Sequence, residues 1–122
     1  MDTKGLMTYA LTKPCAYADM PLSDGNVLIK VGKHYFASFF VLSGKECMTV
    51  KGEADYHTAL RSKYPEYVYK GWHCPPVQAK YNSTVVIDSD IPYGELVNMI
   101  DVSYEYNLSK FSKKEKERFC LD

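Results

Sequence analysis

The chain has 122 residues, of which 46% are hydrophobic and 25% charged, a length and balance that suit one globular domain and leave little room for two. Fifteen acidic residues balance fifteen lysines and arginines, so the chain lacks the basic excess of a strong DNA binder. No run of 18 apolar residues occurs, and the first residues lack the pattern of a secretory signal, so we expect a cytoplasmic protein that is not bound to a membrane.

The first predicted element is a short helix over residues 3–12. Thr3 can cap its N-terminus, apolar residues recur on one face at steps of three and four, and Pro14 ends it. Residues 19–26 are rich in residues that break helices and strands, which predicts a loop.

Three strands follow the loop. β-Branched and aromatic residues over 26–31 and 34–41 flank a two-residue turn at 32–33 that contains glycine, a pattern typical of a hairpin. A second turn at 43–45 leads to a third strand over 46–51. Three consecutive strands joined by tight turns predict an antiparallel meander.

The pattern then changes from a strand period to a helical one. Residues 53–64 repeat apolar side chains on one helical face, and the helix ends before Pro65. Residues 67–70 predict a fourth strand, and residues 83–88 predict a fifth.

A long amphipathic helix comes next. Asp90 can cap its start, and Pro92 suits its first turn. Its apolar stripe recurs at steps of three and four and consists of Leu96, Met99, Ile100, Ser103, Tyr104, Leu108 and Phe111. The basic residues within 110–122 predict a solvated tail at the frayed end of this helix.

The element order is therefore α-β-β-β-α-β-β-α. With no long linker and no repeat, this order predicts a single α+β domain over residues 1–122, in which helices pack on one face of an antiparallel sheet. The predicted core includes Leu28, Phe36, Phe40, Leu60, Val85, Leu96 and Ile100.

Several short motifs in the second half of the chain belong together. They are Pro65 after the middle helix, Trp72-His73, Tyr81-Asn82, the strand end at 85–88, Ile91-Pro92 and the stretch at 100–104, and residues 28–36 and Lys51 add to them. On these motifs the chain resembles the MmcQ/YjbR-like family over nearly its whole length. The resemblance implies an α+β domain of the double-wing type, with DNA as its ligand.

The segment 73–82 departs from the family pattern. Relatives carry a compact His-x-Asn-Lys-x-His-Trp-Asn motif here, whereas this chain is two residues longer, lacks the second histidine and has Tyr81 in place of tryptophan. No role of that histidine, or of the asparagine-lysine pair, can therefore be transferred.

The adjacent residues His73 and Cys74 raise the question of a metal site or a nucleophile. Zinc ligands usually come in spaced pairs, and neighbouring side chains of an extended segment point apart, so we expect no metal and no cofactor. A cysteine–histidine nucleophile fails for the same geometric reason. Pro75-Pro76 predicts instead a turn between two strands, which either only reverses the chain or also presents a recognition surface.

The cysteines support a reducing compartment. Cys15, Cys47, Cys74 and Cys120 are widely spaced, and no pair forms a Cys-x-x-Cys motif. In a chain long enough to bury a core, this spacing favours free thiols.

Three functions remain open. The preferred one is a small, soluble, non-catalytic module that binds nucleic acid, because lysines at the hairpin tips can contact phosphates and tyrosines can stack on bases. The second is an adaptor that binds a protein or peptide on the open edge or face of an aromatic-rich sheet. An enzyme ranks last, because no residues suggest a nucleophile, a base and an orienting group. The predicted binding surface consists of Lys33, Lys45, Lys51, His73, Lys80, Tyr81 and Asn82.

Overall fold

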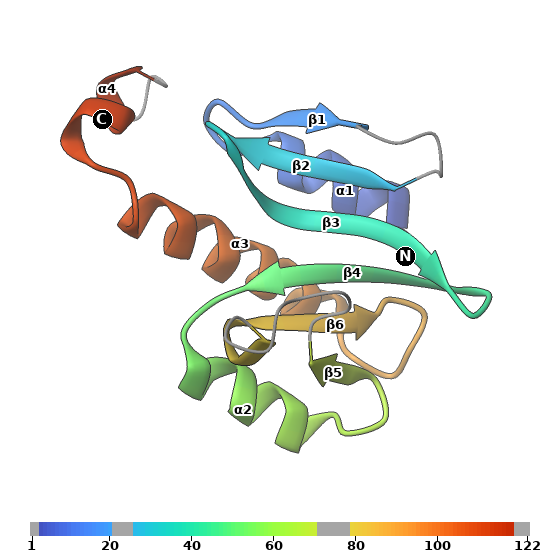
Figure 1. Cartoon of the computed structure of the whole chain (residues 1–122). Helices are drawn as coiled ribbons and strands as arrows, with labels where there is room; N and C mark the ends of the chain where they lie inside the picture. The colour runs from blue at the N-terminus through green and yellow to red at the C-terminus, as the bar shows by residue number, and fades with distance from the viewer. Residues whose placement is uncertain (1–2, 21–25, 71–78, 119–122) are drawn as a thin grey trace.

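Antiparallel strands form the centre of the structure (Figure 1). The computed structural model describes residues 3–20, 26–70 and 79–118, and within them one six-stranded sheet has the order β1-β2-β3-β4-β6-β5. The strands are β1 (Tyr17–Asp19), β2 (Val27–Val31), β3 (His34–Leu42), β4 (Lys45–Lys51), β5 (Val68–Lys70) and β6 (Asn82–Val86). The helices are α1 (Thr3–Leu11), α2 (Ala54–Lys63), the 3-10 helix η1 (Ala79–Tyr81), α3 (Tyr93–Ser109) and α4 (Lys113–Arg118).

The predicted meander of β2, β3 and β4 is confirmed. Gly32 in the β2–β3 turn has a φ of 63°, and Ser43 and Gly44 in the β3–β4 turn have φ values of 53° and 79°. Positive φ at both central residues gives the turn twist that matches paired strands.

Strand β6 then pairs with β4, with Met48 opposite Val85, and separates β4 from β5.

Helix α3 packs across β3 and β4 and buries most of the predicted stripe, although Leu108 is only half-buried and Phe111 lies beyond the end of the helix at Ser109. Leu96, Met99, Ile100 and Tyr104 are each 3% exposed or less. The rings of Phe36 and Tyr104 meet edge to face, with centroids 5.0 Å apart. The stripe therefore forms one wall of the core, as its spacing predicts.

Helix α2 covers the same face of the sheet as α3, but over β6 and β5 rather than over β3 and β4. Its His57 bonds Ser83, which pairs with the core residue Val50. Lys63 at the end of α2 forms an ion pair with Glu95 of α3 at 2.6 Å. The one-sided helix layer that the sequence predicts is therefore confirmed.

Two predicted core residues prove wrong. Leu28 and Phe40 are only half-buried, whereas their neighbours Ile29 and Phe39 are at most 1% exposed. Side chains alternate along a strand, so Ile29 and Phe39 face the helices while Leu28 and Phe40 lie on the other face.

Three of the described elements were not predicted: β1, the 3-10 helix η1 and α4. Strand β1 adds an edge to the sheet, with Tyr17 opposite Lys30. The basic stretch after residue 110 does not continue α3 as a fraying end. It starts a separate helix α4, where Ser112 and Glu115 bond each other's backbone amides in a capping box.

Candidate functional site

A groove lies at the end of the sheet where β4 ends and η1, β6 and the C-terminal turn of α3 meet, on the left of Figure 1. Its volume is about 360 Å³. The side chains that line it are Tyr35, Lys51, Tyr81, Asn82, Tyr106 and Lys110. We refer to these six residues as the tyrosine–lysine groove.

Strand pairing brings the first part of the groove together. Lys51, the last residue of β4, pairs with Asn82, the first residue of β6. The amide of Gly52 then donates to the carbonyl of Tyr81 at 3.0 Å. Three groove residues thus come from two segments that are thirty residues apart in sequence.

Polar residues of α3 fix the helix against the strands that carry the groove. The Ser103 hydroxyl donates to the Phe36 carbonyl at 2.5 Å and accepts from the Lys51 amide at 2.8 Å. The Asn107 carboxamide donates to the Tyr35 carbonyl at 2.7 Å. These bonds place the last turn of α3, with Tyr106 and Lys110, at the groove.

Each tyrosine of the groove has a lysine ammonium at its ring. The distance from Nζ to the ring centroid is 4.1 Å for Lys51 on Tyr35 and 4.9 Å for Lys110 on Tyr106. Lys80, which neighbours the groove, lies 5.2 Å from the ring of Tyr81. Cation–π attraction of about 0.5–1 kcal/mol per exposed pair holds the charges beside the rings.

A buried polar network supports the groove from the side of α2. His57 Nδ1 and Ser83 Oγ are 2.6 Å apart, and Arg61 donates to Ser83 Oγ at 3.2 Å and to the Asn82 carbonyl at 3.4 Å. Burial lowers the pKa of His57 from 6.5 to about 4, so its imidazole is neutral near pH 7. Both His57 and Ser83 are fully buried, so this pair fixes segments of the groove and has no surface at which to act on a substrate.

The predicted binding residues are only partly brought together. Lys51, Tyr81 and Asn82 line the groove, and Lys80 lies beside it. Lys33 is in the β2–β3 turn at the same end of the sheet, whereas Lys45 starts β4 at the opposite end of β3 (Figure 1). The two ends of β3 are eight residue steps apart, so the turns that carry Lys33 and Lys45 lie about 26 Å from each other. His73 lies outside the described residues.

The sequence did not identify Tyr35, Tyr106 and Lys110 as partners in one site. Tyr35 lies in an apolar strand pattern, and Tyr106 lies beside the stripe of α3 rather than on it. The feature that marks Tyr35 and Tyr106, together with Tyr81, as groove residues is that all three tyrosines are only half-buried. That feature exists only in the folded chain.

The comparisons with known proteins now bear on this architecture. Residues 11–106 match the model of the YjbR family. The chain belongs to the YjbR family. This result agrees with the resemblance that the sequence motifs suggested.

Solved structures share the fold. A crystal structure of a Deinococcus radiodurans protein with a DUF419 domain superposes with a TM-score of 0.86 at 22% identity, covering 98% of this chain and 88% of that one. A Pseudomonas syringae protein matches in a crystal structure (TM-score 0.72, 15% identity, 90% of this chain and 100% of that one) and in a solution structure (0.71, 16%, 93% and 96%). At these identities the likeness concerns the fold alone. A search of curated proteins found no match.

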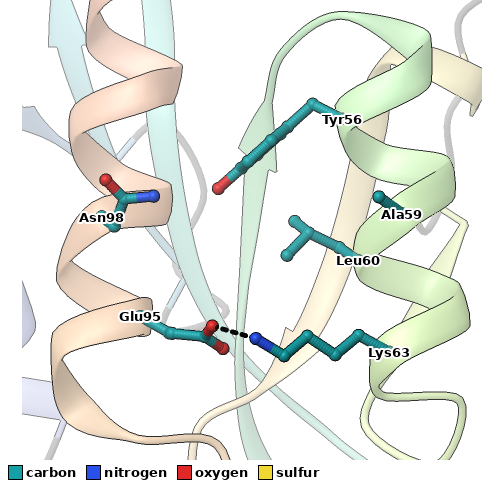
Figure 2. A pocket seen from close by; sticks show the side chains of 6 residues that line it. All are labelled: Tyr56, Ala59, Leu60, Lys63, Glu95 and Asn98. Atoms are coloured by element: carbon teal, nitrogen blue, oxygen red, sulfur yellow. Dashed lines mark hydrogen bonds and ion pairs between the residues drawn. The ribbon is translucent and has the colours of Figure 1, made fainter.

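A second cleft lies between α2 and α3 (Figure 2). Its volume is about 140 Å³, and Figure 2 shows the Tyr56 hydroxyl directed toward α3, which carries Asn98 and Glu95. The Glu95 carboxylate already bonds Lys63, and it accepts a hydrogen bond from Tyr64. Because this cleft is smaller and its charged groups bond each other, the tyrosine–lysine groove is the stronger candidate site.

Neither a cluster of metal ligands nor a membrane span occurs in the described part of the chain. Among residues 3–20, 26–70 and 79–118, no group of three histidine, cysteine or carboxylate side chains could hold a metal ion. Over the same ranges, no helix has the length and apolar character needed to cross a bilayer. Neither Cys15, which is exposed, nor Cys47, which is buried, forms a disulfide bond in the described part of the chain, and Cys74 and Cys120 lie outside it.

Proposed function

We propose that this YjbR-family protein is a non-catalytic module that binds nucleic acid in the tyrosine–lysine groove. The observation that carries the proposal is the pairing of Lys51, Lys80 and Lys110 with one tyrosine ring each around a single concave surface. Lysine ammonium groups neutralise phosphates, and tyrosine rings stack on bases. Each pair therefore offers both kinds of contact that a nucleotide needs.

The zero net charge of the chain is compatible with this proposal because the charges are separated in space. Lys33, Lys51, Lys80 and Lys110 lie at the groove end of the sheet, and α4 beyond them carries four basic residues and two acidic ones. Asp88, Asp90 and Glu95 precede or open α3, at the opposite end of the sheet. Only two acidic residues, Glu53 after the end of β4 and Glu105 beside Tyr106, are neighbours of the groove residues in sequence. At physiological salt the Debye length is about 8 Å, much shorter than the sheet, so a phosphate at the groove interacts mainly with the local lysines.

The test is binding of fluorescently labelled DNA at several salt concentrations, measured by anisotropy. Lys51→Gln and Lys110→Gln should each weaken binding and reduce the slope of log affinity against log salt by about 0.7–0.9. Lys45→Gln is the matched control, since Lys45 is an exposed lysine at the other end of β3. Binding that is absent at low salt, or that depends equally on Lys45, would contradict the proposal.

A second candidate function is a peptide-binding adaptor. It is favoured by an apolar hollow of about 200 Å³ next to the β3–β4 turn, lined in part by Leu42, Tyr69 and Val86. Tyr69 belongs to β5, a three-residue edge strand, and an open sheet edge can accept a peptide strand. Co-purification of one specific polypeptide that Tyr69→Ser abolishes would support this function, and its retention by Tyr69→Ser would contradict it.

A further inference from the structure

We infer that the tyrosine–lysine groove takes single-stranded rather than duplex nucleic acid. This inference rests on the proposed function, since it specifies the form of the same ligand. It depends on the exposure of the three rings, on the concave shape of the groove and on the positions of the three ammonium groups.

The first step concerns the rings. Tyr35, Tyr81 and Tyr106 are each half-exposed, and all three line the groove, so each residue can be reached from outside. A tyrosine ring binds a base through its flat face, which is free only in an unstacked base. In a duplex each base face is covered by its neighbours, and only base edges and the backbone can be contacted. The rings can therefore contribute to binding a single strand but add little to binding a duplex.

The second step concerns shape. Proteins that read duplex DNA usually insert a helix or a strand pair into the major groove, which is about 12 Å wide. The surface here is instead a hollow of about 360 Å³, and the buried stripe of α3 faces the sheet. A volume of this size lies at the lower end of the range for pockets that hold small molecules, so the hollow has room for a base but not for a duplex. A flexible strand can place bases in this hollow, whereas a duplex can only lie across its rim.

The third step concerns charge. Lys51 and Lys110 line the hollow from β4 and from the end of α3, and Lys80 of η1 lies beside it at the ring of Tyr81, so the three ammonium groups come from three separate elements. A single strand can bend to bring successive phosphates to these positions. If each of the three lysines neutralises one phosphate of the strand, the slope of log affinity against log salt is about −2.

The experiment compares three labelled probes of equal length on the unmodified protein: a thymidine strand, the corresponding duplex and a strand of abasic sites. We expect the thymidine strand to bind at least about 10-fold more tightly than the other two. Loss of one base–aromatic stack should lower affinity by about 5- to 150-fold. Tyr106→Ser should therefore weaken binding of the thymidine strand within that range and leave duplex binding unchanged.

Matched variants separate stacking from folding. Tyr106→Phe keeps the ring and should retain binding of the thymidine strand. Tyr69→Ser removes an exposed tyrosine on β5, outside the groove, and should also retain it. Equal or tighter binding of the duplex, or equal binding of the abasic strand, would overturn the single-strand inference while leaving the proposed function intact. Failure of all three probes to bind at low salt would contradict the proposed function itself.

Discussion

Gly52 offers a sharp test of how the groove is supported, because the imidazole of His57 occupies the space that a side chain would need. A Cβ atom at residue 52 would lie 2.9 Å from His57 Nε2 and 3.3 Å from the nearest ring atom of Tyr56. His57 cannot easily move away, because it is fully buried and bonded to Ser83 at 2.6 Å. Gly52→Ala should therefore lower the free energy of unfolding by about 1–3 kcal/mol, the usual cost of overpacking.

The backbone of Gly52 adds nothing to this cost, since it is not among the glycines with positive φ. Gly94→Ala provides the control. Gly94 lies in α3, and outside its own helix no atom lies within 4 Å of the position that an added methyl group would take. Alanine there should raise the free energy of unfolding by about 0.4–1 kcal/mol, because it lowers the conformational entropy of the unfolded chain. The opposite signs of the two substitutions distinguish steric contact from a general effect of replacing glycine.

The assay is urea unfolding followed by circular dichroism, with the unfolding free energy taken by linear extrapolation. In a His57→Ala background the contact is gone, so Gly52→Ala should cost less there, with a coupling energy of about 0.5–3 kcal/mol. The reasoning would be refuted if Gly52→Ala changed stability by less than about 0.5 kcal/mol. It would also be refuted if the substitution cost the same in both backgrounds.

Three further predictions concern stability. Burial lowers the pKa of His57 from 6.5 to about 4. As the pH falls through that range, the imidazole binds a proton in the unfolded chain but not in the folded one. The unfolding free energy should therefore fall by about 3 kcal/mol between pH 6.5 and 4. Urea unfolding of His57→Gln across the same range should lack this component, and an unchanged pH dependence would contradict it. Ser103→Ala should lower the free energy of unfolding by about 1–3 kcal/mol, because it leaves the buried Phe36 carbonyl without its donor. Thermal unfolding measures this change, and an unchanged stability would contradict the role of Ser103. Ser112→Ala should destabilise α4 by about 1 kcal/mol without affecting the core. The expected sign is faster amide hydrogen exchange in residues 113–118 alone, and unchanged exchange there would show that the helix does not need this cap.

Elements with a long repeating pattern were predictable from the sequence, whereas of the two three-residue strands only β5 was predicted. The stripe of α3 and the three strands of the meander carry enough residues to define a period. Strand β1 is as short as β5, but its sequence Tyr-Ala-Asp contains alanine and aspartate, which are uncommon in strands, whereas β5 contains valine and tyrosine. Strand β1 is held by tertiary contacts instead, among them an ion pair between Asp19 and Lys30 at 2.7 Å. Helix α4 did leave a signal, since Ser112 and Glu115 have the spacing of a capping box.

The faces of the strands and the composition of the site required the folded chain. Ile29 follows Leu28 and Phe39 precedes Phe40, so apolar neighbours leave the alternation ambiguous, and a shift of one residue reverses the face. The separation of Lys45 from Lys51 follows from the predicted strand over 46–51, because the two residues lie at its opposite ends. The sequence gives no sign, however, that β4 pairs with β6, which brings Lys51 beside Asn82.

The most direct test of the proposed binding surface is an NMR titration of the ¹⁵N-labelled protein with a short thymidine strand. The account predicts the largest amide shifts at residues 35, 51–52, 80–82 and 106–110, which surround the groove, and little change at 42–47 beside the β3–β4 turn. Shifts centred on 42–47 and Tyr69, or no shifts at strand concentrations well above the protein concentration, would contradict the assignment of the tyrosine–lysine groove as the nucleic-acid site.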